Sequence, residues 1–324
     1  MKPLLEIKNL KAYFHTRRGI VKAVDGLSFH VDPGETLGIV GESGSGKSVL
    51  QLSYMKLLPT PPLKIESGQA IFDGRDLLTM DPHSLRDLRG NQITMIFQEP
   101  MTSLNPYMKI GNQLIEPLVL HLKMSKQKAW QEAIAAMKRV GIAEAESAMN
   151  SYPHEFSGGM RQRVMIAMAL TTKPKLLIAD EPTTALDVTV QAQILDLLRE
   201  LQKETGMSII LITHDLGVVA GLAHRVIVMY AGHIMEQGTA DDLFYRAQNP
   251  YTHGLLKSTP RLDIPQGMLP TIGGTPPDLT RLGAGCPFYE RCSYHMDICT
   301  SVFPPGRTIA PEHESYCYLE TRPS

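Results

Sequence analysis

Residues 41–48 read Gly41-Glu42-Ser43-Gly44-Ser45-Gly46-Lys47-Ser48, which is the G-x-x-x-x-G-K-S pattern of a phosphate-binding loop, or P-loop. An apolar run with strand character, residues 36–40, comes before it, and a run with helical character, residues 49–55, comes after it. This order of strand, glycine-rich loop and helix is the context that the motif requires. An ordinary glycine-rich turn with a solvated lysine is the alternative interpretation.

Each part of the P-loop has a predicted role in holding a nucleotide. The glycines let the backbone curl so that successive N–H groups point at one anion, and the helix N-terminus adds partial positive charge. We therefore expect the phosphates to contact Gly41, Ser43, Gly44, Ser45 and Gly46. Lys47 is expected to reach the β- and γ-phosphates, and the hydroxyl of Ser48 is expected to ligate Mg²⁺.

The composition is that of an ordinary globular protein. The 324 residues are enough for one large domain with an appendage, or for two domains. Hydrophobic residues make up 43% and charged residues 20%, and the net charge of −1 provides no general field that would attract nucleic acid. The N-terminus lacks a signal-peptide pattern, and no apolar run approaches the ~18 residues of a membrane span. We therefore expect an intracellular protein that does not cross a membrane by itself.

A second apolar strand is predicted at residues 176–180, and it leads into two carboxylates, Asp180 and Glu181. Its continuous apolar run suits a parallel strand that is covered on both faces, and the carboxyl ends of such strands face the ligand crevice. With a P-loop in the same chain, Asp180 is the expected Mg²⁺-side carboxylate, and Glu181 is expected to polarise the attacking water. A pair of solvated acids at the start of a loop is the alternative.

Two further polar residues come at the ends of predicted core strands. Residues 93–100 are predicted to form a strand that ends in a polar loop containing Gln98, for which a solvated amide is the alternative. Residues 208–213 form a β-branched run that ends at His214. A lone histidine is usually structural, but at this place in a nucleotide-binding fold it is predicted to contact the γ-phosphate.

Helical periodicity and few β-branched residues predict a helical insertion at residues 111–150 of an α/β domain. Ser157, Gly158 and Gly159 then stand directly before a helix and form a second potential phosphate cradle, or a plain helix N-cap. Near the N-terminus, Tyr13 and Phe14 are candidates for stacking on an adenine ring, with ordinary strand packing as the alternative.

The tail after residue 250 has a different composition from the rest of the chain. It is rich in proline and glycine, which favours an extended path over a second core. It also holds all four cysteines, Cys286, Cys292, Cys299 and Cys317. Clustered thiols in a tail with little core fit a metal site, because a metal would supply the missing stability. The wide gaps favour a [4Fe–4S] cluster over zinc, which prefers closely spaced pairs, and unmetallated thiols are a third interpretation.

Residues 4–260 as a whole resemble an ABC transporter ATP-binding subunit. Six motifs of that family occur in order at ordinary spacing: Walker A at residues 41–48, the Q-loop at Gln98, the signature at residues 157–160, Walker B with the catalytic glutamate at residues 176–181, the D-loop at Ala185-Leu186-Asp187 and the switch histidine at His214. Alignment with the first-strand motif of the family makes Phe14 the preferred adenine-stacking residue, with Tyr13 second.

The resemblance implies an α/β fold with a mixed-sheet core, an antiparallel β subdomain and a helical insertion. The ABC ATPase domain is expected to span residues 1–250, with its helical subdomain at about residues 100–165. Residues 251–324 are expected to form a small irregular extension that carries the four cysteines.

Finer features resemble the branch of the family that imports dipeptides, oligopeptides and nickel. Residues 97–106, 152–156 and 249–252 carry this likeness, and Met160 stands where the usual signature has glutamine. Such a departure resembles the first of two non-identical ATPase subunits. The resemblance therefore implies a sibling ATPase, two transmembrane permease subunits and, indirectly, an extracytoplasmic solute-binding protein. It implies a location at the cytoplasmic face of the inner membrane, with no nucleic-acid partner.

The mechanism that the resemblance implies uses two ATPase subunits that sandwich two nucleotides. Ser157 and Gly159 would contact the ATP held by the sibling, while Glu181 orients water, His214 supports the γ-phosphate and Gln98 accompanies Mg²⁺. Tails in this branch also resemble cluster-binding segments, which supports the [4Fe–4S] expectation. Import of nickel or another small solute, an exporter and a soluble non-transport ATPase are the alternative functions.

Overall fold

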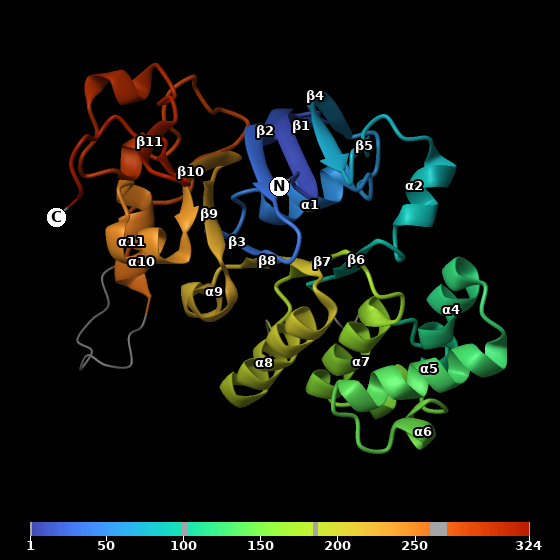
Figure 1. The fold of residues 1–324 in the computed structure, drawn as a ribbon. Helices are drawn as coiled ribbons and strands as arrows, with labels where there is room; N and C mark the ends of the chain where they lie inside the picture. Colours follow the sequence, from blue (N-terminus) through green and yellow to red (C-terminus); the bar gives the residue numbers. More distant parts are fainter. Residues whose placement is uncertain (1, 99–102, 184–186, 260–270, 324) are drawn as a thin grey trace. The chain divides into compact units, whose positions relative to one another are not determined.

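The computed structural model describes residues 2–98, 103–183, 187–259 and 271–323 (Figure 1). The chain divides into two compact units. The first consists of Met1–Asp32, Thr36–Thr79 and Ile212–Ser324, and the second of Pro33–Glu35 and Met80–Leu211. The P-loop belongs to the first unit, and the strand that leads to Asp180 belongs to the second.

The N-terminal part of the first unit forms an antiparallel sheet with the strand order β2-β1-β4-β5. Its strands are β1 (Leu5–Thr16), β2 (Gly19–Val31), β4 (Leu63–Phe72) and β5 (Arg75–Asp76). The start of β1 alternates as a half-buried strand should, with Leu5 and Ile7 buried and Lys8 exposed. This sheet confirms the antiparallel β subdomain that the resemblance implied.

The rest of the first unit is built on a mixed sheet in which the strands follow the order β11-β12-β10-β9-β3. These strands are β3 (Thr36–Val40), β9 (Arg225–Tyr230), β10 (His233–Thr239), β11 (Arg307–Ala310) and β12 (His313–Ser315). β3 and β9 are parallel and buried along their whole length, which explains their continuous apolar character. The other neighbouring pairs are antiparallel. The helices of this unit are α1 (Lys47–Tyr54), α9 (Leu216–Leu222), α10 (Ala240–Arg246) and α11 (Pro250–Ser258).

The C-terminal region contributes more structure than its composition predicted. It adds β11 and β12 to the mixed sheet, where Glu236 and Gln237 of β10 pair with Ser315 and Glu314 of β12. Two short 3₁₀ helices, η2 (Tyr289–Arg291) and η3 (Asp297–Thr300), precede this hairpin. The pairing is not local in sequence, so composition could not reveal it. The proline-rich residues 260–270, including Pro260, Pro265 and Pro270, lie outside the described residues.

The second unit contains the strand order β8-β7-β6, in which β6 and β7 are parallel. The strands are β6 (Ile93–Ile96), β7 (Leu176–Asp180) and β8 (Ser208–Thr213), the last of which ends in the first unit. α4 (Ile110–Leu122), α5 (Lys126–Arg139) and α6 (Ala145–Ala148) lie at the helical insertion predicted for residues 111–150, and α7 (Gly158–Leu170) packs against α4 and α5 (Figure 1). The remaining helices are α2 (Pro82–Leu88), η1 (Pro153–Glu155) and α8 (Val188–Thr205). In the described part of the chain, no helix has both the length and the apolar character that a membrane crossing requires.

Candidate functional site

The P-loop follows β3 directly and has the curled backbone that the sequence predicted. Gly41 has a φ of 152°, and a Cβ atom there would lie 2.1 Å from the carbonyl oxygen of Met229. Gly46 has a φ of 99°, and its Cβ would lie 2.2 Å from the carbonyl oxygen of Ala23. Both positions require glycine, because a side chain would collide with backbone that cannot move out of the way.

Lys47 closes the loop on itself. Its side chain is almost fully buried, and Nζ donates hydrogen bonds of 2.8 Å to the carbonyl oxygen of Gly41 and 3.0 Å to that of Glu42. Ser48 follows in the first turn of α1. Ser43 and Gly44 are exposed at the outside of the loop. The loop therefore combines a cationic side chain, a helix N-terminus and an accessible backbone, which together suit a phosphate group.

The second unit brings together two residues that the sequence selected separately. Asp180 ends β7 and is buried, and Glu181 follows it with a φ of 46°, a backbone conformation that is uncommon for glutamate. Nε2 of Gln98 donates a hydrogen bond of 3.0 Å to Oε2 of Glu181. A carboxylate whose orientation is fixed by an amide donor can accept a proton from a water molecule in a defined direction.

The Ser157-Gly158-Gly159 segment forms the start of α7. Ser157 is the N-cap, and its hydroxyl accepts a hydrogen bond of 3.3 Å from the backbone N–H of Met160. Ser157 and Gly158 are exposed, whereas a Cβ at Gly159 would lie 3.2 Å from the side chain of Val190. The capping interpretation is thus correct for Ser157, and the exposed position of the helix start also leaves it accessible to a ligand.

Only part of the D-loop, residues 185–187, lies within the described residues. Ala185 and Leu186 lie outside the described residues. Asp187 is the N-cap of α8, and its Oδ1 accepts a hydrogen bond of 2.9 Å from the backbone N–H of Val190.

The remaining candidates belong to the first unit. His214 is exposed directly after β8, and the next residue, Asp215, caps α9 by accepting from the backbone N–H groups of Gly217 and Val218. The hydroxyl of Tyr13 donates a 2.6 Å hydrogen bond to Asp25, so this ring is occupied within the sheet. Phe14, the next residue of β1, is half-buried.

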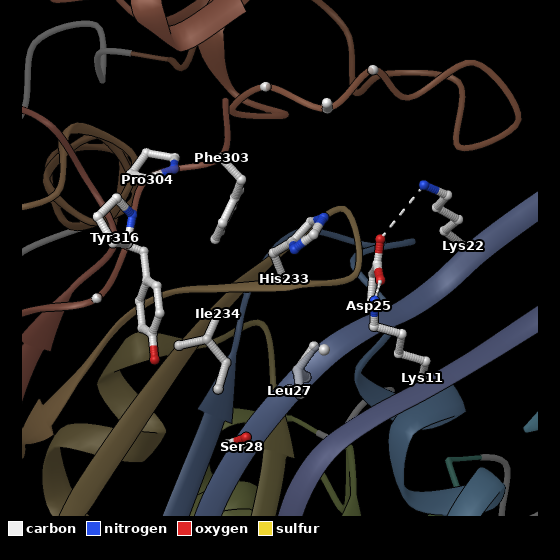
Figure 2. Close-up of a pocket in the computed structure, with 16 residues that line it drawn as sticks. Lys11, Lys22, Asp25, Leu27, Ser28, His233, Ile234, Phe303, Pro304 and Tyr316 are labelled. Carbon is white, nitrogen blue, oxygen red and sulfur yellow. Dashed lines mark ion pairs between the residues drawn. The ribbon is translucent and has the colours of Figure 1, made fainter. Parts of the chain in front are cut away.

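A cavity of about 420 Å³ is lined by residues of β1, β2, β10 and the C-terminal region (Figure 2). Lys11 and Lys22 line it and lie 3.4 and 3.7 Å from the carboxylate of Asp25. The imidazole of His233 stacks on Phe303, with 4.4 Å between the ring centroids. Burial lowers the pKa of His233 to about 4, which makes this imidazole neutral at physiological pH.

The prediction of a [4Fe–4S] cluster at the four cysteines is wrong, and the zinc alternative is not supported either. Among the residues that the structure describes, no group of three or more His, Cys, Asp or Glu side chains is arranged to hold a metal ion. All four cysteines are free thiols. Burial raises the pKa of Cys286 to about 12 and also raises the pKa of Cys292 and Cys317, which favours the protonated thiol in the metal-free chain. Spacing alone could not reveal this environment.

Comparison with known proteins identifies the family. The family model described as "ABC transporter" matches residues 24–184, and the one described as "Oligopeptide/dipeptide transporter, C-terminal region" matches residues 235–299. Over 315 residues the chain is 55% identical to the oligopeptide transport ATP-binding protein OppD of Escherichia coli (strain K12), covering 97% of this chain and 93% of the relative. The chain belongs to the ABC transporter ATP-binding family.

Two further relatives of this ABC ATPase extend the likeness. The dipeptide transport ATP-binding protein DppD of Bacillus subtilis (strain 168) is 52% identical over 321 residues, which cover 99% of this chain and 96% of the relative. A solved dimeric structure of the ATP-binding cassette MJ0796, bound to ADP and phosphate, has a TM-score of 0.66 and 28% identity over 73% of this chain and 98% of that chain. These likenesses confirm the predicted α/β ABC ATPase fold, and with it an ATP-hydrolysing activity.

One contact near the P-loop of this ABC ATPase has no signal in the sequence. The guanidinium of Arg291, in the C-terminal region, holds the carboxylate of Glu42 through two hydrogen bonds. The two residues are 249 positions apart, and neither stands in a recognisable pair pattern. Only the folded chain shows that the second residue of the P-loop has an ionic partner.

Proposed function

We propose that this ATPase powers the import of dipeptides or oligopeptides through a membrane transporter. The observation that carries the proposal is the 55% identity with OppD of Escherichia coli, an oligopeptide transport ATP-binding protein, over 97% of the chain. The match of residues 235–299 to the C-terminal region of oligopeptide and dipeptide transporters supports it, because that region lies outside the common ATPase core.

The P-loop binds the phosphates of ATP. The backbone N–H groups of Gly41, Ser43, Gly44, Ser45 and Gly46 provide the cradle, and Lys47 turns its ammonium to the β- and γ-phosphates. Phe14 stacks on the adenine. The curled glycine backbone and the adjacent cationic side chain support these roles.

Hydrolysis depends on residues that orient water and respond to the γ-phosphate. Glu181 accepts a proton from the attacking water, and Gln98, through its hydrogen bond to Glu181, keeps that carboxylate in one orientation. His214 donates to the γ-phosphate. The oxygen donors of Ser48, Asp180 and Gln98 suit a hard cation and would hold Mg²⁺, which neutralises phosphate charge when it is bound with ATP.

The active form is a heterodimer with a sibling ATPase. Ser157, Gly158 and Gly159 contact the nucleotide held by the sibling, and their position at the exposed start of α7 supports this role. The dimeric state of the MJ0796 cassette supports pairing of two such chains, and Met160 in the signature supports two non-identical partners.

The dimer drives two transmembrane permease subunits at the cytoplasmic face of the inner membrane, and a solute-binding protein delivers the peptide from outside. Within the chain, residues 1–250 form the ATPase domain, residues at about 100–165 its helical subdomain, and residues 251–324 the extension that marks the peptide-importer branch. No nucleic acid takes part.

Purification of a tagged chain from native membranes in mild detergent tests this function. Recovery of a sibling ATPase and two permease chains, with ATP turnover stimulated by the binding protein and peptides, is the expected result. ATP turnover that is stimulated by nickel complexes and not by peptides would contradict the proposed peptide substrate. Recovery of the chain without membrane partners would contradict transport.

A further inference from the structure

Glu42, the second residue of the P-loop, connects the loop to the C-terminal region. Nη1 and Nη2 of Arg291 donate hydrogen bonds of 2.6 and 3.0 Å to Oε2 and Oε1 of Glu42. Two parallel bonds between a guanidinium and a carboxylate fix both direction and distance. The side chain of Arg291 is 6% exposed and that of Glu42 24% exposed, so solvent screens this ion pair less than a surface pair.

Arg291 is itself held firmly in place. Its Nε donates a 2.8 Å hydrogen bond to the carbonyl oxygen of Gly273, and Nη1 donates one of 3.0 Å to the hydroxyl of Tyr230. The guanidinium also lies over the rings of Tyr230 and Phe288, at 5.6 and 5.8 Å from their centroids. Arg291 therefore presents an anchored pair of donors to Glu42.

The backbone of Glu42 is held as well as its side chain. Its N–H donates a 3.0 Å hydrogen bond to the hydroxyl of Tyr251, which is fully buried in α11. Its carbonyl oxygen accepts from Nζ of Lys47 at 3.0 Å and from the backbone N–H of Ser45 at 3.2 Å. Glu42 is thus fixed through three chemical groups, two of which are held by residues 251 and 291.

These contacts differ in what happens to them when a phosphate binds. Lys47 donates to the carbonyl oxygens of Gly41 and Glu42, and because an ammonium group has only three N–H donors, a bound phosphate competes with these oxygens for Nζ. The bonds from Arg291 and Tyr251 do not involve Lys47, so this competition does not affect them. They would keep the loop curled whether or not Lys47 keeps both carbonyl contacts.

The C-terminal region also lies near the loop at a second place. A hollow of about 170 Å³ is lined by Ser43, Gly44 and Ser45 of the P-loop together with Pro276, Pro277 and Leu279 of the C-terminal region. The C-terminal region thus contacts the P-loop at Glu42 and shares a hollow with the residues that follow.

We propose that Arg291 is a positioning residue for nucleotide binding: by holding Glu42, it keeps the P-loop in its phosphate-binding shape, so the C-terminal region sets the affinity of this subunit for ATP. The inference rests on the proposed role of the P-loop. Arg291 touches neither nucleotide nor reacting atoms, and its effect falls on ATP affinity and not on the rate of the chemical step.

The test measures the Kd of the full chain for a fluorescent ATP analogue, together with the KM for ATP and kcat of the purified transporter complex. Arg291→Gln and Glu42→Gln are each expected to raise the Kd and KM about tenfold, while kcat stays within about twofold. Arg291→Lys keeps the charge without the two-point geometry and is expected to restore part of the affinity. Arg281→Gln is the matched control, because Arg281 is an exposed arginine of the same region that pairs with Asp278.

The double variant Glu42→Gln/Arg291→Gln tests whether the two residues affect nucleotide binding through one shared contact. We expect its Kd to be no higher than that of either single variant, because the same contact is lost in all three. Glu42→Gln alters only the loop residue, so it stays informative even if the Arg291 variants fold poorly. The inference would be overturned if both single variants had Kd values within twofold of the native value. It would also be overturned if the increase in Kd of the double variant were the product of the increases in the two single variants. Lys47→Ala distinguishes a failure of this inference from a failure of the proposed function. Unchanged nucleotide binding in that variant would contradict the proposed role of the P-loop itself.

Discussion

Gln98 and Glu181 are joined by a hydrogen bond of 3.0 Å between Nε2 and Oε2, although 83 positions separate them in the sequence. Gln98 follows β6 and Glu181 follows β7, and these two strands are parallel neighbours. The carboxyl ends of parallel neighbours lie at the same edge of a sheet, which is why the two side chains meet. This hydrogen bond can hold the Glu181 carboxylate in one direction.

Glu181→Gln is expected to abolish turnover while preserving ATP binding. The amide keeps the size of the side chain but cannot take a proton from water, so kcat should fall about 100-fold or more. Steady-state phosphate release in the transporter complex, and the Kd for a fluorescent ATP analogue, measure the two properties. Glu132→Gln, at an exposed glutamate of α5 in the same unit, is the control. Native turnover in Glu181→Gln, with the sibling site inactivated, would exclude Glu181 as the base.

Gly46→Ala is expected to destroy nucleotide binding, whereas Gly44→Ala should be much milder. A Cβ at Gly46 meets the carbonyl oxygen of Ala23 at 2.2 Å, and one at Gly44 meets no atom within 4 Å. Both glycines have positive φ, 99° and 79°, so the two variants share the backbone strain and differ in the collision. Equal Kd values for the two variants would show that steric fit at Gly46 is unimportant.

The free energy of unfolding is expected to fall between about pH 6.5 and pH 4 because of His233. Burial is the main cause that lowers the pKa of His233 from about 6.5 to about 4, with Lys22 and Lys11 adding to the effect and Asp25 opposing it. The unfolded chain therefore takes up a proton in this window before the folded chain does, and acid favours unfolding. Urea denaturation as a function of pH should show a weaker slope for His233→Gln than for the native chain. His83→Gln, at a mostly exposed histidine, should leave the slope unchanged.

Glu236→Gln is expected to lower the free energy of unfolding by about 1–3 kcal/mol. The carboxylate of Glu236 is fully buried, and it accepts from the backbone N–H groups of Gln248 and Asn249 at 2.7 and 3.1 Å. Oε1 also lies 2.8 Å from Nε2 of His313 in β12. An amide can satisfy these donors with only one oxygen. Glu320→Gln, at an exposed residue of the same region, should have no effect on denaturation.

Local patterns predicted much of this fold. The glycine-rich loop, the strands at residues 36–40 and 176–180 and the helices between residues 110 and 139 each follow from spacing over a few residues, and the structure contains them all. The Arg291–Glu42 pair and the β10–β12 pairing depend on residues that are far apart in sequence and carry no local signal. The prediction of a [4Fe–4S] cluster failed because the number and spacing of the cysteines do not show how buried the thiols are.

β12 gives β10 a hydrogen-bonded neighbour on the side away from β9. A chain shortened to end with α11 would lose that neighbour and leave the backbone N–H and C=O groups on this edge of β10 without strand partners, while the pairing with β9 would remain. Bare strand edges pair with other chains, so such a truncation is expected to aggregate before any catalytic defect can be measured. We therefore expect residues 307–315 to protect this edge from self-association, and engineered versions of this ATPase should retain them for solubility alone.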